Sequence, residues 1–288
     1  MDNNRPNIKL VECPRDAMQG WKGFITTDRK VEYINSLLQV GFHTIDFGSY
    51  VSPKAIPQMA DTKDVLAGLD LSNTRSELLA IIANLRGAQE AVQSPAIKYL
   101  GFPFSVSESF QQRNTNASIA EALERVREIQ QLCISHDKVL VVYISMGFGN
   151  PYNDPYSERI VFDYVNKLIA EGITIISLAD TVGVATPNLV NRISSYLVKS
   201  LPETEIGVHL HSTAVNWKEK VTAAFDAGIL RFDGALKGIG GCPMAKDELV
   251  GNMNTEWLLS FFQENGCSTN INNEALQESL RLADMIFV

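Results

Sequence analysis

Two histidines separated by one residue are the most distinctive chemical feature of the sequence. His209 and His211 end a short apolar run, residues 206–211, which is typical of a β-strand. Because successive side chains of a strand point to opposite faces, the two imidazoles face the same side. Such a pair can bind a divalent metal ion, but histidines at a polar strand end more often bond only to backbone. The pair alone therefore favours the plainer interpretation.

Apolar and β-branched segments alternate with helical segments along the whole chain. Apolar residues at helical spacing predict helices over residues 28–40, 118–135, 156–170, 187–199 and 217–227. The predicted strands are residues 8–13, 43–47, 77–82, 97–104, 139–145, 174–179, 206–211 and 231–236. Eight strands that alternate with helices predict an α/β fold, a TIM (β/α)8 barrel. A doubly wound open sheet is the alternative, but no GxGxxG sequence follows the first strand.

The sequence predicts one large domain followed by a short C-terminal extension. Residues 1–265 are expected to form the barrel catalytic domain. Residues 266–288 are expected to form a C-terminal helical extension packed on the barrel, with the extra helix over 272–285.

Polar side chains stand at the ends of several predicted strands. Barrel enzymes build their sites from the carboxyl ends of strands, so these groups are expected to converge. They are Arg15 and Asp16 after the first strand, Asp46 in the second, Asp180 after the sixth, and the glycine-rich 238–243 after the eighth. A carboxylate with two imidazoles suits a divalent ion in an oxygen and nitrogen site.

Composition narrows the class of protein. The net charge of −8 gives no basic face, which argues against a nucleic-acid partner. No apolar run reaches the roughly 18 residues of a membrane span, and the polar residues 1–9 do not resemble a signal peptide, so no membrane partner is expected. The cysteines, Cys13, Cys133, Cys242 and Cys267, lack CxxC spacing and are typical of reduced thiols in a cytoplasmic protein.

Five motifs then carry a family resemblance over residues 8 to about 265. The segment 11–19 resembles the RDGxQ-type opening of 3-hydroxy-3-methylglutaryl-CoA lyases and of the related metallolyases and synthases. Residues 49–59 resemble the SFVSPKxxPQM stretch of those lyases, and 177–183 their SLxDTxG. Residues 238–243 resemble their GLGGCP loop, and Asn252 with Glu256 matches the GNxxTE that follows.

The resemblance implies a role for each matching residue. The implied ligands of a divalent metal, Mg or Mn, are Asp16, His209, His211 and Asn252, and Asp16 and His209 also count among the catalytic residues. Arg15 would stabilise the developing enolate, and Cys242 would donate or accept a proton. The implied supporting residues are Glu12, Asp46, Asp180 and Glu256, and Lys22 and Lys54 are candidates for binding the CoA phosphates.

The function implied is that of a hydroxymethylglutaryl-CoA lyase. Such an enzyme cleaves 3-hydroxy-3-methylglutaryl-CoA, or a close 3-hydroxyacyl-CoA, to acetyl-CoA and acetoacetate. The resemblance also implies an acyl-CoA partner, a homodimer and a place in leucine degradation.

Some positions depart from the lyase pattern and keep alternatives open. Ser212 stands where the family has Asp, Trp21 where it usually has Glu, and residues 145–150 replace a cysteine-rich segment, so the acyl group is less defined than the reaction. A Claisen-type synthase or a hydroxy-oxoacid aldolase of the same superfamily is the first alternative, although synthases usually carry HxHND and a long C-terminal region. A non-catalytic barrel subunit is the second alternative. The presence of all the implied catalytic and metal-binding residues argues against it: Arg15, Asp16, His209, His211, Cys242 and Asn252.

Overall fold

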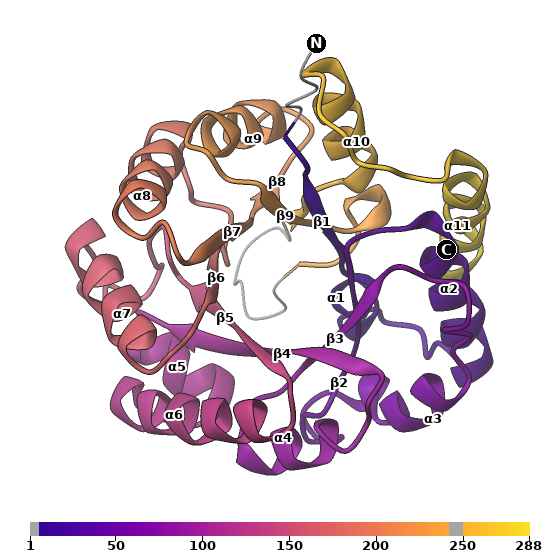
Figure 1. Ribbon diagram of the computed structural model, residues 1–288, viewed down its shortest axis with the longest axis horizontal. Helices are drawn as coiled ribbons and strands as arrows, with labels where there is room; N and C mark the ends of the chain where they lie inside the picture. Colours follow the sequence, from indigo (N-terminus) through magenta and orange to yellow (C-terminus); the bar gives the residue numbers. More distant parts are fainter. Residues whose placement is uncertain (1–5, 242–249) are drawn as a thin grey trace.

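The computed structural model describes residues 6–241 and 250–288, and its centre is a closed barrel of parallel strands (Figure 1). The barrel closes where β9 pairs in parallel with β1, in a register that sets Lys9 opposite Arg231. The strands in barrel order are β1 (Lys9–Glu12), β2 (Thr44–Ser49), β3 (Glu77–Ile81), β4 (Ile97–Ser105), β5 (Val139–Ser145), β6 (Ile175–Ala179), β7 (Glu205–His209) and β9 (Arg231–Gly234). The predicted (β/α)8 barrel is confirmed, and the open sheet is excluded.

Helices surround the barrel and bury one apolar side against it (Figure 1). The predicted helices are present as α2 (Thr27–Val40), α6 (Ile119–Ser135), α7 (Glu158–Ala170), α8 (Pro187–Ser200), α9 (Trp217–Asp226) and α11 (Asn273–Ile286). Further helices are α1 (Pro14–Gln19), α3 (Thr62–Ala67), α4 (Leu85–Ala91), α5 (Glu108–Thr115) and α10 (Thr255–Glu264), with short 3-10 turns η1 (Pro57–Met59) and η2 (Leu236–Gly238).

The second histidine lies outside the barrel strand that the sequence predicted. β7 ends at His209, and His211 belongs to a separate two-residue strand, β8 (His211–Ser212). β8 pairs antiparallel with β10 (Gly251–Asn252), with His211 opposite Asn252. The prediction of one strand over 206–211 is therefore wrong at its end, because the chain leaves the barrel after His209 to pair across its mouth.

The last helix packs against the second. The backbone N–H of Asn272 donates to the carbonyl of Val40, at 2.9 Å, where α11 begins. Leu276 and Leu282 are buried, and Phe287 meets the ring of Trp21 edge to face at 5.3 Å. In Figure 1 α11 lies beside α2 at the outer edge of the molecule. The extra C-terminal helix is confirmed, while a division at residue 265 stays a prediction.

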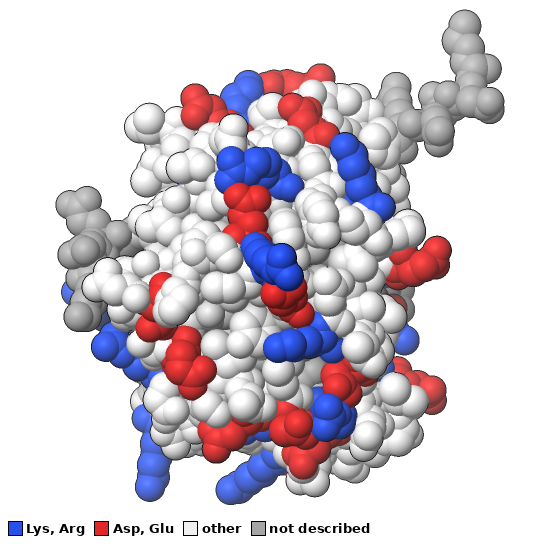
Figure 2. Space-filling model, turned by 90° about the vertical axis from the view of Figure 1, so that its left-hand side faces the viewer, with Lys and Arg blue, Asp and Glu red and all other residues white. Residues whose placement is uncertain are grey.

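The surface seen in Figure 2 mixes charges of both signs. Basic and acidic side chains alternate there instead of forming a patch of one sign. Ion pairs also join opposite charges of different elements at the surface, such as Arg127 with Glu171 at 2.8 Å. Among the described residues, no helix is long and apolar enough to cross a membrane.

Candidate active site

The turn from β1 into α1 places the first two functional side chains. Pro14 stands at the first helical position, where its missing N–H costs nothing and its fixed φ favours the helix. Arg15 and Asp16 follow immediately, at the carboxyl end of β1, and both are largely buried, at 8% and 7% exposed. The short helix therefore aims a cation and an anion over the mouth of the barrel.

Arg15 is held by two carboxylates. Its Nε lies 3.0 Å from Asp46 Oδ2 and its Nη2 lies 2.5 Å from the same oxygen, so Asp46 lies along one edge of the guanidinium. Its Nη1 donates to Asp16 Oδ1 at 2.8 Å. Burial raises the pKa of Asp46 to about 6, although the Arg15 charge opposes that rise. Fork geometry of this kind fixes the direction of the guanidinium.

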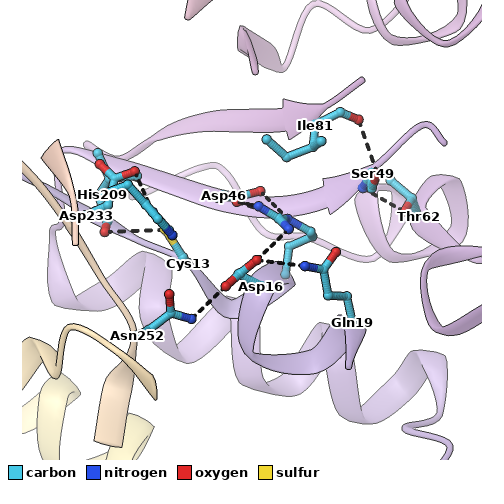
Figure 3. A network of polar contacts seen from close by, with 12 residues as sticks. Cys13, Asp16, Gln19, Asp46, Ser49, Thr62, Ile81, His209, Asp233 and Asn252 are labelled. Carbon is cyan, nitrogen blue, oxygen red and sulfur yellow. Dashed lines mark hydrogen bonds and ion pairs between the residues drawn. The ribbon is translucent and has the colours of Figure 1, made fainter. Parts of the chain in front are cut away.

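Asp16 accepts hydrogen bonds from three side chains, and Figure 3 labels two of the donors, Gln19 and Asn252. Its Oδ1 accepts from Gln19 Nε2 at 2.7 Å, and its Oδ2 accepts from Asn252 Nδ2 at 2.7 Å. Burial alone would raise the pKa of Asp16, but the nearby Arg15 charge lowers it below its ordinary value. Asp16 is therefore an anion at neutral pH, as a metal ligand must be.

The two imidazoles lie next to Asp16. Potential ligand atoms of Asp16, His209 and His211 all lie within 4.8 Å of one another. Burial, together with the charge of His209, lowers the pKa of His211 to about 4, which leaves its ring neutral and able to bind a metal. Burial also lowers the pKa of His209, but the hydrogen bond and charge of Asp233 outweigh it and raise that pKa.

Asp233 orients the first histidine from inside the barrel. Its Oδ2 lies 3.2 Å from His209 Nδ1, so the opposite ring nitrogen, Nε2, is left for a ligand (Figure 3). A carboxylate behind a metal-binding histidine is a common arrangement, because it fixes the tautomer and the direction of the ring. Cys13 lies in the same cluster with its thiol buried, and burial raises the pKa of that thiol well above its ordinary value.

The side chain of Asn252 tests whether these residues fit a metal ion. Its Nδ2 is satisfied by Asp16 and by the carbonyl of Ile239, at 2.9 Å. Its Oδ1 is buried and makes no hydrogen bond to any described residue. A buried amide oxygen without a donor costs free energy unless something binds it. A hard divalent ion would use this oxygen with Asp16, His209 and His211, so the donor set fits a metal.

The described part of the glycine loop passes directly over the site. Gly240 has φ = 94°, and a Cβ there would lie 2.7 Å from Asn252 Nδ2 and 2.8 Å from the carbonyl of Asp16. Only glycine allows this backbone conformation and this close approach. Cys242, which follows this loop, lies outside the described residues.

Two of the predicted supporting carboxylates, Glu12 and Glu256, bind the segment that follows β9. Glu12 is fully buried and accepts from the backbone N–H of Leu236 at 2.8 Å and from Thr255 Oγ1 at 2.6 Å. Glu256 accepts from the backbone N–H of Lys237 at 3.0 Å. Both carboxylates therefore hold the segment that leads from β9 into the glycine loop.

Asp180 pairs with a lysine that the sequence analysis did not single out. Its Oδ2 accepts from the buried Lys220 Nζ at 2.7 Å, and its Oδ1 accepts from the backbone N–H of Ala185 at 2.9 Å.

Lys22 and Lys54, the candidates for CoA phosphates, are exposed in the loops after β1 and β2. Gln19 and Asp233 were also missed, although Gln19 stands one helical turn after Asp16.

The fold and the site define a (β/α)8-barrel enzyme whose polar residues converge at the carboxyl ends of the strands. The chain belongs to the HMGL-like family, whose model matches residues 7–283. The prediction made from the five motifs is therefore confirmed, and the protein is a carbon–carbon lyase of this family.

Similar proteins include lyases from animals and bacteria. The chain is 34% identical over 280 residues to the mitochondrial hydroxymethylglutaryl-CoA lyase of Mus musculus, covering 97% of this chain and 84% of that protein. It is 34% identical to the cytoplasmic 3-hydroxy-3-methylglutaryl-CoA lyase of Homo sapiens, over 94% of this chain and 73% of that protein. A solved HMG-CoA lyase of Acinetobacter baumannii, in complex with coenzyme A and 3-methylmalate, superposes with a TM-score of 0.91 at 34% identity, over 100% of this chain and 93% of that one.

Proposed function

We propose that this protein cleaves 3-hydroxy-3-methylglutaryl-CoA, or a close 3-hydroxyacyl-CoA, to acetyl-CoA and acetoacetate with a bound Mg or Mn ion. The observation that carries the proposal is the cluster of Asp16, His209 and His211, with ligand atoms within 4.8 Å of one another beside a buried Arg15. The chain is also similar over 97% of its length to a lyase named for this substrate.

The reaction makes three demands on the site. The C3 hydroxyl must lose its proton, and the C2–C3 bond must break. The electron pair of that bond becomes a thioester enolate, and a proton added to C2 completes acetyl-CoA. The site therefore needs a group that lowers the cost of removing the hydroxyl proton, a cation near the thioester oxygen, and a proton carrier.

The first demand is met by the ligand set. A divalent ion held by Asp16, His209, His211 and Asn252 would lower the pKa of the substrate hydroxyl and orient it. The protein prepares that position in advance, because Gln19 and Arg15 fix the carboxylate of Asp16 and Asp233 fixes the ring of His209.

Arg15 meets the second demand. Of its five N–H donors, one on each of its three nitrogens goes to Asp46 or Asp16. One N–H on each terminal nitrogen makes no hydrogen bond to a described residue and could bind an incoming oxygen. A cation fixed before the reaction stabilises the enolate charge without reorganising in the transition state.

Cys242 is our candidate for the proton carrier. Gly240 contacts the backbone of Asp16, so the loop that leads to this cysteine lies at the site. A thiol-alkylating reagent should inactivate the enzyme, with protection by substrate, and Cys242→Ser should lower kcat more than it raises KM. A Cys242→Ser variant with full kcat would leave the thiol without a chemical role.

The remaining assignments follow from the same proposal. An acyl-CoA substrate is supported by the similar bacterial lyase solved with coenzyme A. The homodimer, the place in leucine degradation and the CoA-phosphate role of Lys22 and Lys54 remain predictions. The cytoplasmic location is also a prediction, because the similar lyases include both cytoplasmic and mitochondrial proteins.

The decisive experiment measures acetoacetate and acetyl-CoA released from 3-hydroxy-3-methylglutaryl-CoA. We expect turnover that a chelator abolishes and that added Mg or Mn restores. Full turnover after exhaustive chelation would contradict the metal-dependent mechanism. No cleavage of any 3-hydroxyacyl-CoA, together with condensation of acetyl-CoA and a 2-oxoacid, would favour the synthase alternative.

A further inference from the structure

A buried lysine on α9 reaches under the loop that carries the second histidine. Lys220 is 1% exposed, and its Nζ donates to Asp180 Oδ2 at 2.7 Å, to the carbonyl of His211 at 2.9 Å and to the carbonyl of Gly183 at 3.2 Å. An ammonium group has three N–H donors, so all of them are used. One side chain thus joins α9, the segment after β6 and the start of β8.

The partners of Lys220 also hold the first histidine. The backbone N–H of Asp180 donates to the carbonyl of His209 at 2.9 Å. The backbone carbonyls of both histidines are therefore tied to the Asp180–Lys220 pair, His209 through Asp180 and His211 through Lys220.

We propose that Lys220 is a positioning residue that fixes the backbone of His211 and so sets the direction of its imidazole toward the metal site. The inference rests on the proposed metal-dependent function. His211 needs such support because it lies on a two-residue strand outside the barrel, and β10 is its one paired strand among the described residues.

The energetics of buried ion pairs support a geometric role. Two charges removed from water lose hydration that their attraction only about balances, so a pair such as Lys220–Asp180 adds little net stability. The pair does fix three backbone segments at one point. Residues that orient a ligand from behind typically change metal affinity by about 10- to 100-fold when they are replaced.

The test measures Mn²⁺ binding by calorimetry on the intact protein, together with thermal unfolding. Lys220→Met should raise the Kd for Mn²⁺ at least about tenfold while circular dichroism shows a folded barrel. Lys30→Met is the matched control, because Lys30 is also 1% exposed and pairs with a carboxylate, Asp61, at 2.6 Å. It should lose comparable stability and keep the Mn²⁺ affinity.

A double variant separates positioning from charge balance. Asp180→Asn with Lys220→Met removes both charges, so it should regain much of the stability that Lys220→Met loses. If Lys220 positions His211, this variant still binds Mn²⁺ weakly. Mn²⁺ affinity within twofold of wild type in the double variant would overturn the inference, as would an equal loss in Lys30→Met.

The Mn²⁺ titration of the wild-type protein separates the proposed metal-dependent function from the positioning role of Lys220. A wild-type protein that binds no Mn²⁺ would overturn both the metal-dependent function and this inference. Wild-type binding that Lys220→Met leaves unchanged would overturn the inference alone.

Discussion

At the scale of single residues, Arg15 is the side chain whose chemistry is hardest to replace. It presents a rigid fork to Asp46 and Asp16, and two of its five N–H groups make no hydrogen bond to a described residue. Lysine at this position would keep the charge and lose the fork, so the cation would no longer be fixed near the thioester oxygen.

We predict that Arg15→Lys lowers kcat by about 10²- to 10³-fold, the usual cost of removing one preorganised donor from a developing negative charge. KM and the Mn²⁺ affinity should change much less. Steady-state kinetics and calorimetry measure the two effects, and Arg127→Lys, at a surface pair with Glu171, is the control. An unchanged kcat in Arg15→Lys would remove Arg15 from the chemistry.

Glu12 gives a prediction about pH. Burial raises the pKa of this carboxyl from 4.5 to about 8, although Thr255 and the backbone of Leu236 oppose the rise. The unfolded chain therefore loses this proton at lower pH than the folded chain does. Above pH 4.5 the folded state binds more protons at this site, so stability falls as pH rises and the loss is complete above pH 8.

Glu12→Gln removes that loss and keeps an acceptor for the Leu236 N–H. Relative to wild type, its free energy of unfolding should rise between pH 5 and pH 8 by an amount on the order of a few kcal/mol. Urea unfolding at several pH values measures the difference. A difference that does not vary with pH would mean that the folded protein holds Glu12 ionised.

Residue types at strand ends let the sequence predict Arg15, Asp16 and the two histidines as a converging set. The same reasoning missed Lys220, because a lysine in an amphipathic helix is expected on the solvated side. It also missed Asp233, although Asp233 and Arg231 are two residues apart on a predicted strand and so face the same side. Residues that support a ligand side chain without being ligands leave no pattern in the local sequence, because their role depends on which distant part of the chain they contact.

At the scale of elements, β8 and β10 decide where two of the proposed ligands meet. Each strand has only two residues, and their register places His211 opposite Asn252. Strands this short have no periodicity to detect, which is why the sequence predicted one longer strand instead. The long, periodic elements were predicted well, such as the helix predicted over residues 118–135 and found as α6 (Ile119–Ser135).

The close packing of β10 gives a prediction at this scale. A Cβ on Gly251 would lie 2.5 Å from the backbone carbonyl of Gly238, so Gly251→Ala must move β10 or the glycine loop. We expect the Kd for Mn²⁺ to rise by about tenfold, since the displaced strand carries Asn252. Gly20→Ala is the control, because no atom of the described residues lies within 4 Å of that Cβ. Calorimetry on both variants checks this, and equal affinities would contradict the positioning role of β10.

At the scale of the whole molecule, α11 tests whether residues 266–288 are an appendage or part of the barrel. Its contacts run to α2, to Trp21 after α1, and to Lys237 before the glycine loop, whose ammonium pairs with Asp284. Deletion of 273–288 would uncover Tyr33 and other buried side chains of α2. Each large apolar side chain exposed costs about 1.5–3 kcal/mol.

We therefore predict that this deletion lowers the free energy of unfolding by several kcal/mol and leaves a single cooperative transition. Urea unfolding followed by both fluorescence and circular dichroism measures it. Unchanged stability in the deletion variant would show that the helix is an independent extension.

The hydrogen bond between Asn252 and Asp16 joins residues 236 positions apart, and this separation has a consequence for synthesis. The four proposed ligands leave the ribosome in the order Asp16, His209, His211 and Asn252. At about 5–20 residues per second, roughly ten to fifty seconds pass between the first and the last. Throughout that interval the nascent chain offers only a partial set of donors, so a tightly held ion is acquired at the end of translation or later. Binding of an ion by all four proposed ligands would thus be a late event in maturation.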